Sequence, residues 1–343
     1  MTHHGALKHS LRPFLLWLAL FYACWLLYVT LADRWSVVVE HWGIAAAMAL
    51  GSYFAGSTPM GGGTVGFPVL VLLFNEPASL GRDFSFAIQS AGMLSASIFI
   101  FCRRIPLEWH ILKWALIGSA IGTPIGVFLV APFIPALGVK LVFAITWASF
   151  GILHFWKIGE IVSAEGESKM SARFYQWAGL GVGFLGGATA AAITGVGVDM
   201  LLYAILVLAC RADLKIAIPT SVILMAFTSL VGIATRAVQG GLSEELFGNW
   251  LAAAPVVVVG APFGALIASR IGRKPTLIVV SLLCVIQFVW TIQREWDVLQ
   301  WTGSLASLVA VGVVLLLFVW LHHVGDAFLS KKAACAKMES EKG

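Results

Sequence analysis

Two glycine-rich stretches decide the fold of this chain: GGGTVGFPVL, residues 61–70, and TGVGVD, residues 194–199. Each leads into an apolar run of 12 residues, 64–75 and 198–209. A helix of that length rises about 18 Å, little more than half of the roughly 30 Å hydrocarbon core of a bilayer. Non-helical backbone is tolerated at that depth only where protein buries it or where it lines a cavity. We therefore predict two helical hairpins that break at glycines near the middle of a membrane.

The composition of the chain places these hairpins in a polytopic membrane protein. Of 343 residues, 59% are apolar and 11% are charged, and the mean hydropathy is +0.92. Soluble proteins contain about 25% charged residues, so a soluble enzyme, a nucleic-acid-binding protein and a disordered scaffold are excluded. The lipid bilayer is thus an expected partner, and nucleic acid is not.

Ten further apolar runs have a length close to that of a membrane span. The first of these runs, residues 14–32, is longer than the usual core of a signal peptide, and no cleavage site follows it. We therefore interpret it as a retained helix. With a cytoplasmic N-terminus, 17 of the 22 lysines and arginines fall on the cytoplasmic side, as the positive-inside rule requires. We therefore predict a multi-pass protein of the cell inner membrane with both termini in the cytoplasm. The ten runs are 14–32, 36–57, 84–102, 111–131, 138–156, 175–194, 217–237, 249–269, 276–293 and 303–323.

Three sequence landmarks recur in the same order in the second half of the chain. The glycines at 61–63 recur at 195–197, and two later landmarks recur at similar offsets: GTPIG at 122 as GAPFG at 260, and GVK at 138 as GRK at 272. The first hairpin enters from outside and the second from the cytoplasm, so the two halves have inverted topology, as in many secondary transporters.

The predicted fold is an all-α polytopic membrane protein with two inverted-topology repeats. Each repeat is a glycine-broken helical hairpin plus three helices, and one extra helix stands at each end of the chain. The expected units are an N-terminal cytoplasmic segment with the first helix (1–33), the first repeat (34–156), a cytoplasmic linker (157–173), the second repeat (174–294), and the last helix with a cytoplasmic tail (295–343).

These motifs resemble the TauE/SafE family of sulfite and organosulfonate exporters. The resemblance rests on the stretch 61–70, its degenerate copy at 194–199 and the segment KIAIPTS at 215–221, and it extends over about residues 40–293. The second copy lacks the middle glycine and the later proline, and RDFS at 82–85 stands where a Thr-Ser pair is expected. The resemblance implies a secondary transporter that exports a small anion, sulfite or an organosulfonate such as sulfoacetate.

The starts of the two short helices are the predicted anion site. A helix N-terminus presents unpaired backbone N–H groups and a partial positive charge, and glycine allows close approach because it has no Cβ. Two such ends facing one cavity would suit sulfite or a sulfonate. The alternative is that these small residues only allow helices to pack closely. The candidate substrate-binding residues are Gly61, Gly62, Gly63, Thr64, Ser85, Gln89, Thr194, Gly195, Gly197, Thr220 and Ser221.

Three ionisable residues are candidates for proton coupling. Asp199 lies one turn into the second short helix, where it is either a proton-carrying carboxyl or a carboxylate that stabilises its own helix dipole. Glu40 and His41 lie near the outer start of the first hairpin beside Trp42, a context more typical of interfacial anchoring than of a proton relay. Arg236, near the outer end of its helix, either snorkels or draws anions in from the cavity.

Neither an enzyme, a metal site nor a cofactor is expected. The apolar runs contain no paired carboxylates, metal-ligand cluster or Ser–His set, the five cysteines are scattered, and no ATP-binding G-x-x-x-x-G-K-[ST] loop occurs. Transport must therefore use gradients or a partner, with protons as a candidate coupling ion. An importer, a carrier of another small anion and a non-catalytic membrane scaffold are the alternatives, and the oligomeric state is left open.

Overall fold

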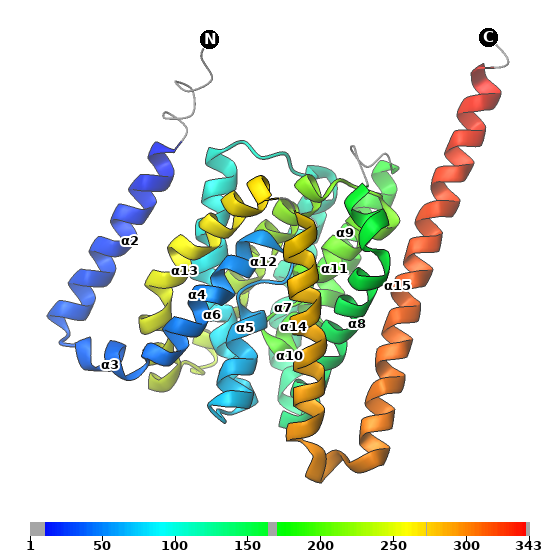
Figure 1. Ribbon diagram of the computed structural model, residues 1–343. Helices are drawn as coiled ribbons and strands as arrows, with labels where there is room; N and C mark the ends of the chain where they lie inside the picture. Colours follow the sequence, from blue (N-terminus) through cyan, green and yellow to red (C-terminus); the bar gives the residue numbers. More distant parts are fainter. Residues whose placement is uncertain (1–10, 164–169, 272, 341–343) are drawn as a thin grey trace.

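A computed structural model describes residues 11–163, 170–271 and 273–340, and within these ranges the chain forms helices without a strand (Figure 1). Nine helices in the described part are long and apolar enough to cross a membrane. The predicted all-α polytopic fold is therefore confirmed. The nine are α2 (Arg12–Leu31), α6 (Ala78–Cys102), α7 (Trp109–Leu129), α8 (Ala136–Ser163), α9 (Ala172–Gly186) with its continuation to Thr194, α12 (Leu214–Val238), α13 (Glu244–Ile271), α14 (Arg273–Arg294) and α15 (Trp296–Ser340).

Parts of the expected cytoplasmic segments lie outside the described residues. These parts are 1–10 at the N-terminus, 164–169 in the linker, residue 272 in the repeated GRK landmark, and 341–343 in the tail. The described start of α2 and the described end of α15 lie at the same end of the molecule (Figure 1). The end of α8 and the start of α9 lie there as well (Figure 1).

Both predicted glycine breaks are present. In each hairpin a helix enters, the chain breaks at the glycines, and a short helix that ends in a π-helical turn leaves. Gly61, Gly195 and Gly197 have φ of +67°, +80° and +103°, a left-handed conformation that glycine adopts without steric cost. The elements are α4 (Trp42–Ser57), α5 (Gly63–Pro68) and η1 (Val69–Leu73) in the first hairpin, and α9, η3 (Gly187–Ala191), α10 (Ala192–Thr194), α11 (Val198–Ala204) and η4 (Ile205–Ala209) in the second.

The predicted span 36–57 is not one helix. It consists of α3 (Trp35–Glu40) and α4, which meet in a bend at His41 (Figure 1). His41 Nδ1 lies 2.9 Å from the carbonyl oxygen of Val37, and Nε2 lies 3.1 Å from Glu245 Oε1. These polar contacts suit the membrane surface better than its core, so α4, with 16 residues, is one arm of a hairpin and not a full span.

Equivalent positions in the two halves of the chain, 136 residues apart, adopt matching local conformations. Asn75 is equivalent to Arg211, and Pro77 is equivalent to Asp213. Asn75 and Arg211, which follow the short helices, both have positive φ, at 61° and 54°. The next residues in register, Pro77 and Asp213, cap α6 and α12 with nearly equal dihedral angles. Both of these helices are 25 residues long. The similarity between the halves is therefore structural as well as sequential.

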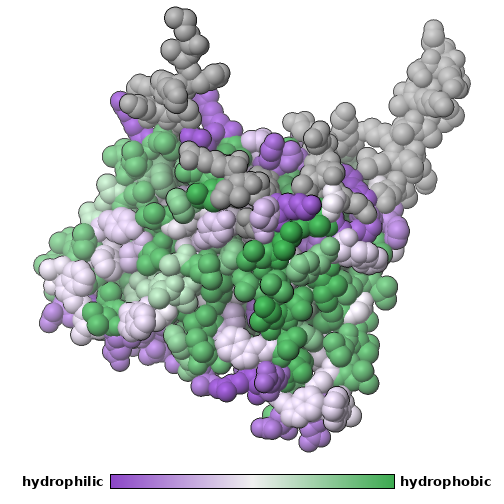
Figure 2. Space-filling view, in the orientation of Figure 1, coloured by the Kyte–Doolittle hydropathy of each residue, from purple (hydrophilic) through white to green (hydrophobic). Residues whose placement is uncertain are grey.

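α6 and α12 form the buried centre of the molecule. They pack on each other. Around them, helices of the first half pack crosswise on helices of the second half: α7 on α9, α4 on α13 and α8 on α14. On the face that Figure 2 shows, apolar residues form a belt across the middle, with hydrophilic residues at both ends. Such a belt is the surface that a membrane protein presents to lipid hydrocarbon.

Glycines allow the crosswise helix pairs to approach to backbone contact. Gly118, Gly122 and Gly126 form a stripe along α7 that faces α9 and η3. A Cβ on Gly122 would overlap the backbone of Phe184, and one on Gly126 would lie 2.6 Å from the Cα of Ala188. Small residues at four-residue spacing are the usual means of close helix packing in membranes.

Gly122→Leu is expected to separate α7 from α9 and to destabilise the protein, because its side chain would meet backbone that no rotamer change can move. Overpacking of this kind costs about 1–3 kcal/mol. The matched control is Gly181→Leu on α9, where an added Cβ meets nothing within 4 Å. Thermal unfolding of the purified proteins, followed by fluorescence-detected size exclusion, should show a lower midpoint for Gly122→Leu alone. Equal midpoints for the two variants would contradict the packing described here.

Candidate functional site

The two glycine breaks meet against one face of α6. Gln89 Nε2 donates to the carbonyl oxygen of Gly195 at 2.9 Å and so links α6 to the second break. At the first break, a Cβ on Gly63 would lie 2.8 Å from Ser85 Oγ and would overlap Val196. All five residues are buried. The breaks of the two halves therefore contact each other and α6 inside the protein, and we call this place the meeting point.

Two buried oxygen atoms without a partner face Gly61 at the meeting point. A Cβ on Gly61 would overlap Gln89 Oε1 and would lie 3.3 Å from Asp199 Oδ2. Neither oxygen has a hydrogen-bond partner among the described residues. The orientation of the Gln89 amide is fixed, because its Nε2 donates to the carbonyl oxygens of Ser85 and Gly195, each at 2.9 Å. The amide oxygen therefore points toward Gly61, which Asp199 Oδ2 also faces.

The other carboxyl oxygen of Asp199 caps its own helix. The N–H of Gly197 donates to Asp199 Oδ1 at 3.2 Å. This contact is the one expected of a carboxyl group that stabilises a helix N-terminus. Oδ2 takes no part in the cap, so one oxygen serves the helix and the other faces the meeting point.

Trp147 of α8 contacts both breaks, a role that its position in the sequence did not reveal. Its indole N–H donates to Thr64 Oγ1 at 2.9 Å, and a Cβ on Gly197 would lie 3.1 Å from its ring. Trp147 is buried and stacks on Phe143, with ring centroids 4.3 Å apart. Tryptophans in membrane proteins usually lie at the interfaces. The only signal available was that Trp147 lies in the middle of an apolar run and not at its edge.

The predicted hydroxyl groups all donate to backbone carbonyl oxygens of their own segments. Three of them, Thr64, Ser85 and Thr194, belong to the breaks or contact them. Thr220 lies elsewhere, because its Oγ1 accepts from the N–H of Glu108 at the start of α7, at 3.0 Å. The donor and acceptor pairs are Thr64 to Met60, Ser85 to Gly81, Thr194 to Ala190, Thr220 to Ile216, and Ser221 to Ile218.

Three more of the predicted residues lie away from the meeting point. Gly62 faces α4, where an added Cβ would lie 3.1 Å from Met48 Cε. Glu40 is exposed and His41 contacts Glu245, both at the far end of α4 from the break. The 16 residues of α4 separate them from the break by about 24 Å.

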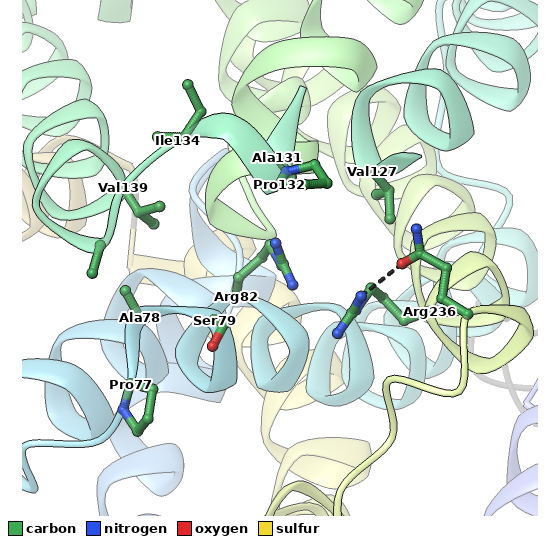
Figure 3. Close-up of a pocket in the computed structure, with 12 residues that line it drawn as sticks. Pro77, Ala78, Ser79, Arg82, Val127, Ala131, Pro132, Ile134, Val139 and Arg236 are labelled. Carbon is green, nitrogen blue, oxygen red and sulfur yellow. Dashed lines mark hydrogen bonds between the residues drawn. The ribbon is translucent and has the colours of Figure 1, made fainter. Parts of the chain in front are cut away.

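A pocket of about 650 Å³ opens beside the N-terminal part of α6, and two arginines extend into it (Figure 3). Both arginines bind the carboxylate of Asp83: Arg82 through Nε at 2.8 Å and Arg236 through Nη2 at 2.8 Å. Gln239 holds Arg236 further, since its Oε1 accepts from Nη1 at 2.6 Å. Asp83 is not among the residues that the sequence predicts for the site, and the available signal is an Arg-Asp pair at the start of an apolar run.

The family model for the sulfite exporter TauE/SafE matches residues 43–290, which include both glycine breaks, α6 and α12. The chain belongs to the TauE/SafE family. The resemblance expected from the motifs is thus confirmed, and this TauE/SafE protein is a multi-pass membrane protein of a transporter family. No curated protein and no solved structure matches the chain.

The meeting point offers hydroxyls, one amide and one carboxyl group for chemistry. Several backbone N–H groups of the breaks already donate within the protein, among them those of Thr64, Gly195 and Gly197. In the described part of the chain, no group of three or more His, Cys, Asp or Glu side chains is placed to hold a metal ion. Among the described cysteines, Cys24, Cys102 and Cys284 are free thiols.

Gln89→Leu is expected to lower thermal stability, because it leaves the carbonyl oxygen of Gly195 without its donor in the protein interior. A buried polar group that loses its partner costs about 1–3 kcal/mol. Gln287→Leu on α14 is the matched control, since Gln287 is also buried and its side chain bonds no described residue. Melting midpoints of the two purified variants make the comparison. A Gln89→Leu protein as stable as the control would show that the second break does not depend on this bond.

Proposed function

We propose that this TauE/SafE protein is a secondary transporter that exports a small anion, sulfite or an organosulfonate such as sulfoacetate, by alternating access around the meeting point. The observation that carries the proposal is the contact between two broken helices from separate halves of the chain, deep inside the protein. A scaffold has no need of such breaks, because each one removes backbone hydrogen bonds that a continuous helix would make. The family supports the class of anion.

In this proposal the transporter consists of two inverted repeats, 34–156 and 174–294, with α2 and α15 as the extra helices. One support is that the hairpins open toward opposite ends of the molecule. The first hairpin ends beside Arg294, which donates to Asn75, and the second ends beside Gly325 of α15. The matching conformations and the crosswise packing of the halves are further support. The end at which α2 begins and α15 ends is then cytoplasmic, as the distribution of basic residues predicts.

Asp199 is the proposed coupling group, and it holds a proton while the anion is bound. Gln89 Oε1 and Asp199 Oδ2 are two buried acceptor oxygens that both face Gly61, and they repel each other unless one of them carries a hydrogen. A protonated Asp199 Oδ2 can donate to Gln89 Oε1, which satisfies both atoms and removes a negative charge from beside the anion. Loss of the proton restores that charge and favours release of the anion. Glu40 and His41 are the alternative coupling group, and their distance from the breaks weighs against them.

Purified protein in liposomes is expected to transport sulfite and to be inhibited by organosulfonates, because both present the same kind of sulfur oxyanion. The measurement is flux of labelled sulfite in competition with sulfoacetate, taurine, sulfate and acetate. Sulfoacetate should compete most strongly and acetate least. Gly63→Leu tests whether the anion passes the meeting point. Its side chain fills the space between Ser85 and Val196 and should abolish flux. Flux in this variant at the wild-type rate would contradict transport through the meeting point.

Asp199→Asn is expected to keep anion binding and thermal stability but to lose the response of flux to a pH gradient. Its side-chain amide can donate to Gln89 Oε1 as the protonated carboxyl does, and it cannot release a proton. If the carboxylate of Asp199 only stabilises its helix, Asp199→Asn should lower the free energy of unfolding by about 0.3–1 kcal/mol and leave coupling nearly normal. Glu40→Gln, the same change of charge at an exposed site, is the control. Flux that still follows the pH gradient in Asp199→Asn would remove Asp199 as the coupling group.

A further inference from the structure

Arg82 presents an unused cationic fork inside the pocket beside α6. Its Nε binds Asp83, while no described residue bonds its two terminal nitrogens. The side chain is only 9% exposed, so these nitrogens are not fully hydrated. Arg236, in contrast, is engaged through all three of its nitrogens with Asp83 and Gln239. The cluster of two arginines and one carboxylate keeps one excess positive charge, and the terminal nitrogens of Arg82 can offer it to an anion in the pocket.

The wall of the pocket opposite the arginines is apolar. Val127 of α7, Ala131 of η2 (Ala131–Phe133) and Val139 of α8 face the guanidinium groups across the pocket (Figure 3). The volume of about 650 Å³ lies within the range of roughly 300–1,000 Å³ that is typical of small-molecule sites. A bare oxyanion would contact only the arginines. A ligand with an anionic head and a short apolar tail would contact both walls.

The pocket adjoins the meeting point through α6. Arg82, Ser85 and Gln89 are spaced three and four residues apart, so they lie along one face of this helix. The second break packs directly on that face, because a Cβ on Gly195 would lie 3.1 Å from the carbonyl carbon of Arg82 and 2.7 Å from Ser85 Cβ. The face runs from the pocket to the two glycine breaks.

We propose that this pocket is a second substrate site, at the mouth of the transport path, which binds the sulfonate group of an organosulfonate with a short apolar tail. The terminal nitrogens of Arg82 bind two sulfonate oxygens, since a planar guanidinium matches the spacing of oxyanion oxygens. Asp83 and Arg236 are positioning residues: the carboxylate holds Nε of Arg82 and turns the free fork into the pocket. The inference rests on the proposed function, because it takes the substrate to be a sulfur oxyanion.

The test is equilibrium binding of propane-1-sulfonate and of sulfite to the purified full chain in nanodiscs. Arg82→Lys keeps the charge but removes the planar guanidinium group. It should weaken the binding of propane-1-sulfonate at least about tenfold. Arg34→Lys is the matched control, since Arg34 pairs with Glu244 outside the pocket. Ala136→Phe fills the exposed rim of the pocket without touching the charge cluster. It should weaken the binding of propane-1-sulfonate and leave the binding of sulfite unchanged.

Unchanged affinity for propane-1-sulfonate in both Arg82→Lys and Ala136→Phe would overturn the inference. Thermal midpoints of the same samples separate a local effect from unfolding, and Ala136→Phe tests the pocket even if Arg82→Lys is unstable. If the wild-type protein binds and transports sulfite and both variants bind propane-1-sulfonate as the wild type does, the pocket is rejected as a substrate site and the proposed function stands. Wild-type protein that neither binds nor transports either anion rejects the proposed function, and the pocket with it.

Discussion

A helix that breaks inside a membrane must find partners for its backbone within the protein, and the bond from Gln89 to Gly195 meets this requirement. It can exist only if α6 lies beside the second break, although 106 residues separate the two along the chain. Because α6 must also touch the first break at Gly63, it occupies the centre with α12 and cannot face lipid. The other helices cover this core, and their outer faces supply the apolar belt.

Close packing keeps the broken hairpins in place. The stripe of Gly118, Gly122 and Gly126 brings α7 to the backbone of α9, and Gly264 on α13 meets the backbone of Tyr53 on α4. Each hairpin is thus clamped by a helix from the other half of the chain. A movement of one half relative to the other must change the environment of both breaks together, which is what alternating access requires.

The features that sequence could predict are those that depend on local properties. Glycines needed for positive φ, and apolar runs too short for a bilayer, identify the breaks without any knowledge of tertiary contacts. At the bend, His41 contacts Glu245, which lies 204 residues away along the chain. The polar residues beside Trp42 indicated an interface, but the run 36–57 did not show where the helix would bend. Thr220 was predicted to belong to the site because its hydroxyl lies in a segment that resembles the family, but this hydroxyl accepts from the N–H of Glu108. The roles of Trp147 and Asp83 likewise arise from contacts between distant segments, which periodicity and composition do not encode.

The charge of the transported anion decides which force drives export if Asp199 is neutral in the loaded state, because one proton then crosses with each anion. A dianion with one proton carries one negative charge outward, which an inside-negative potential favours by about 2.3 kcal/mol per 100 mV. A monoanionic sulfonate with one proton carries no net charge, so the potential does no work on it. Only its own concentration gradient moves it outward, against any inward proton gradient. For the proposed export of a monoanionic sulfonate, the concentration gradient of the anion is therefore the outward driving force, whereas a dianion such as sulfoacetate is also driven by the potential.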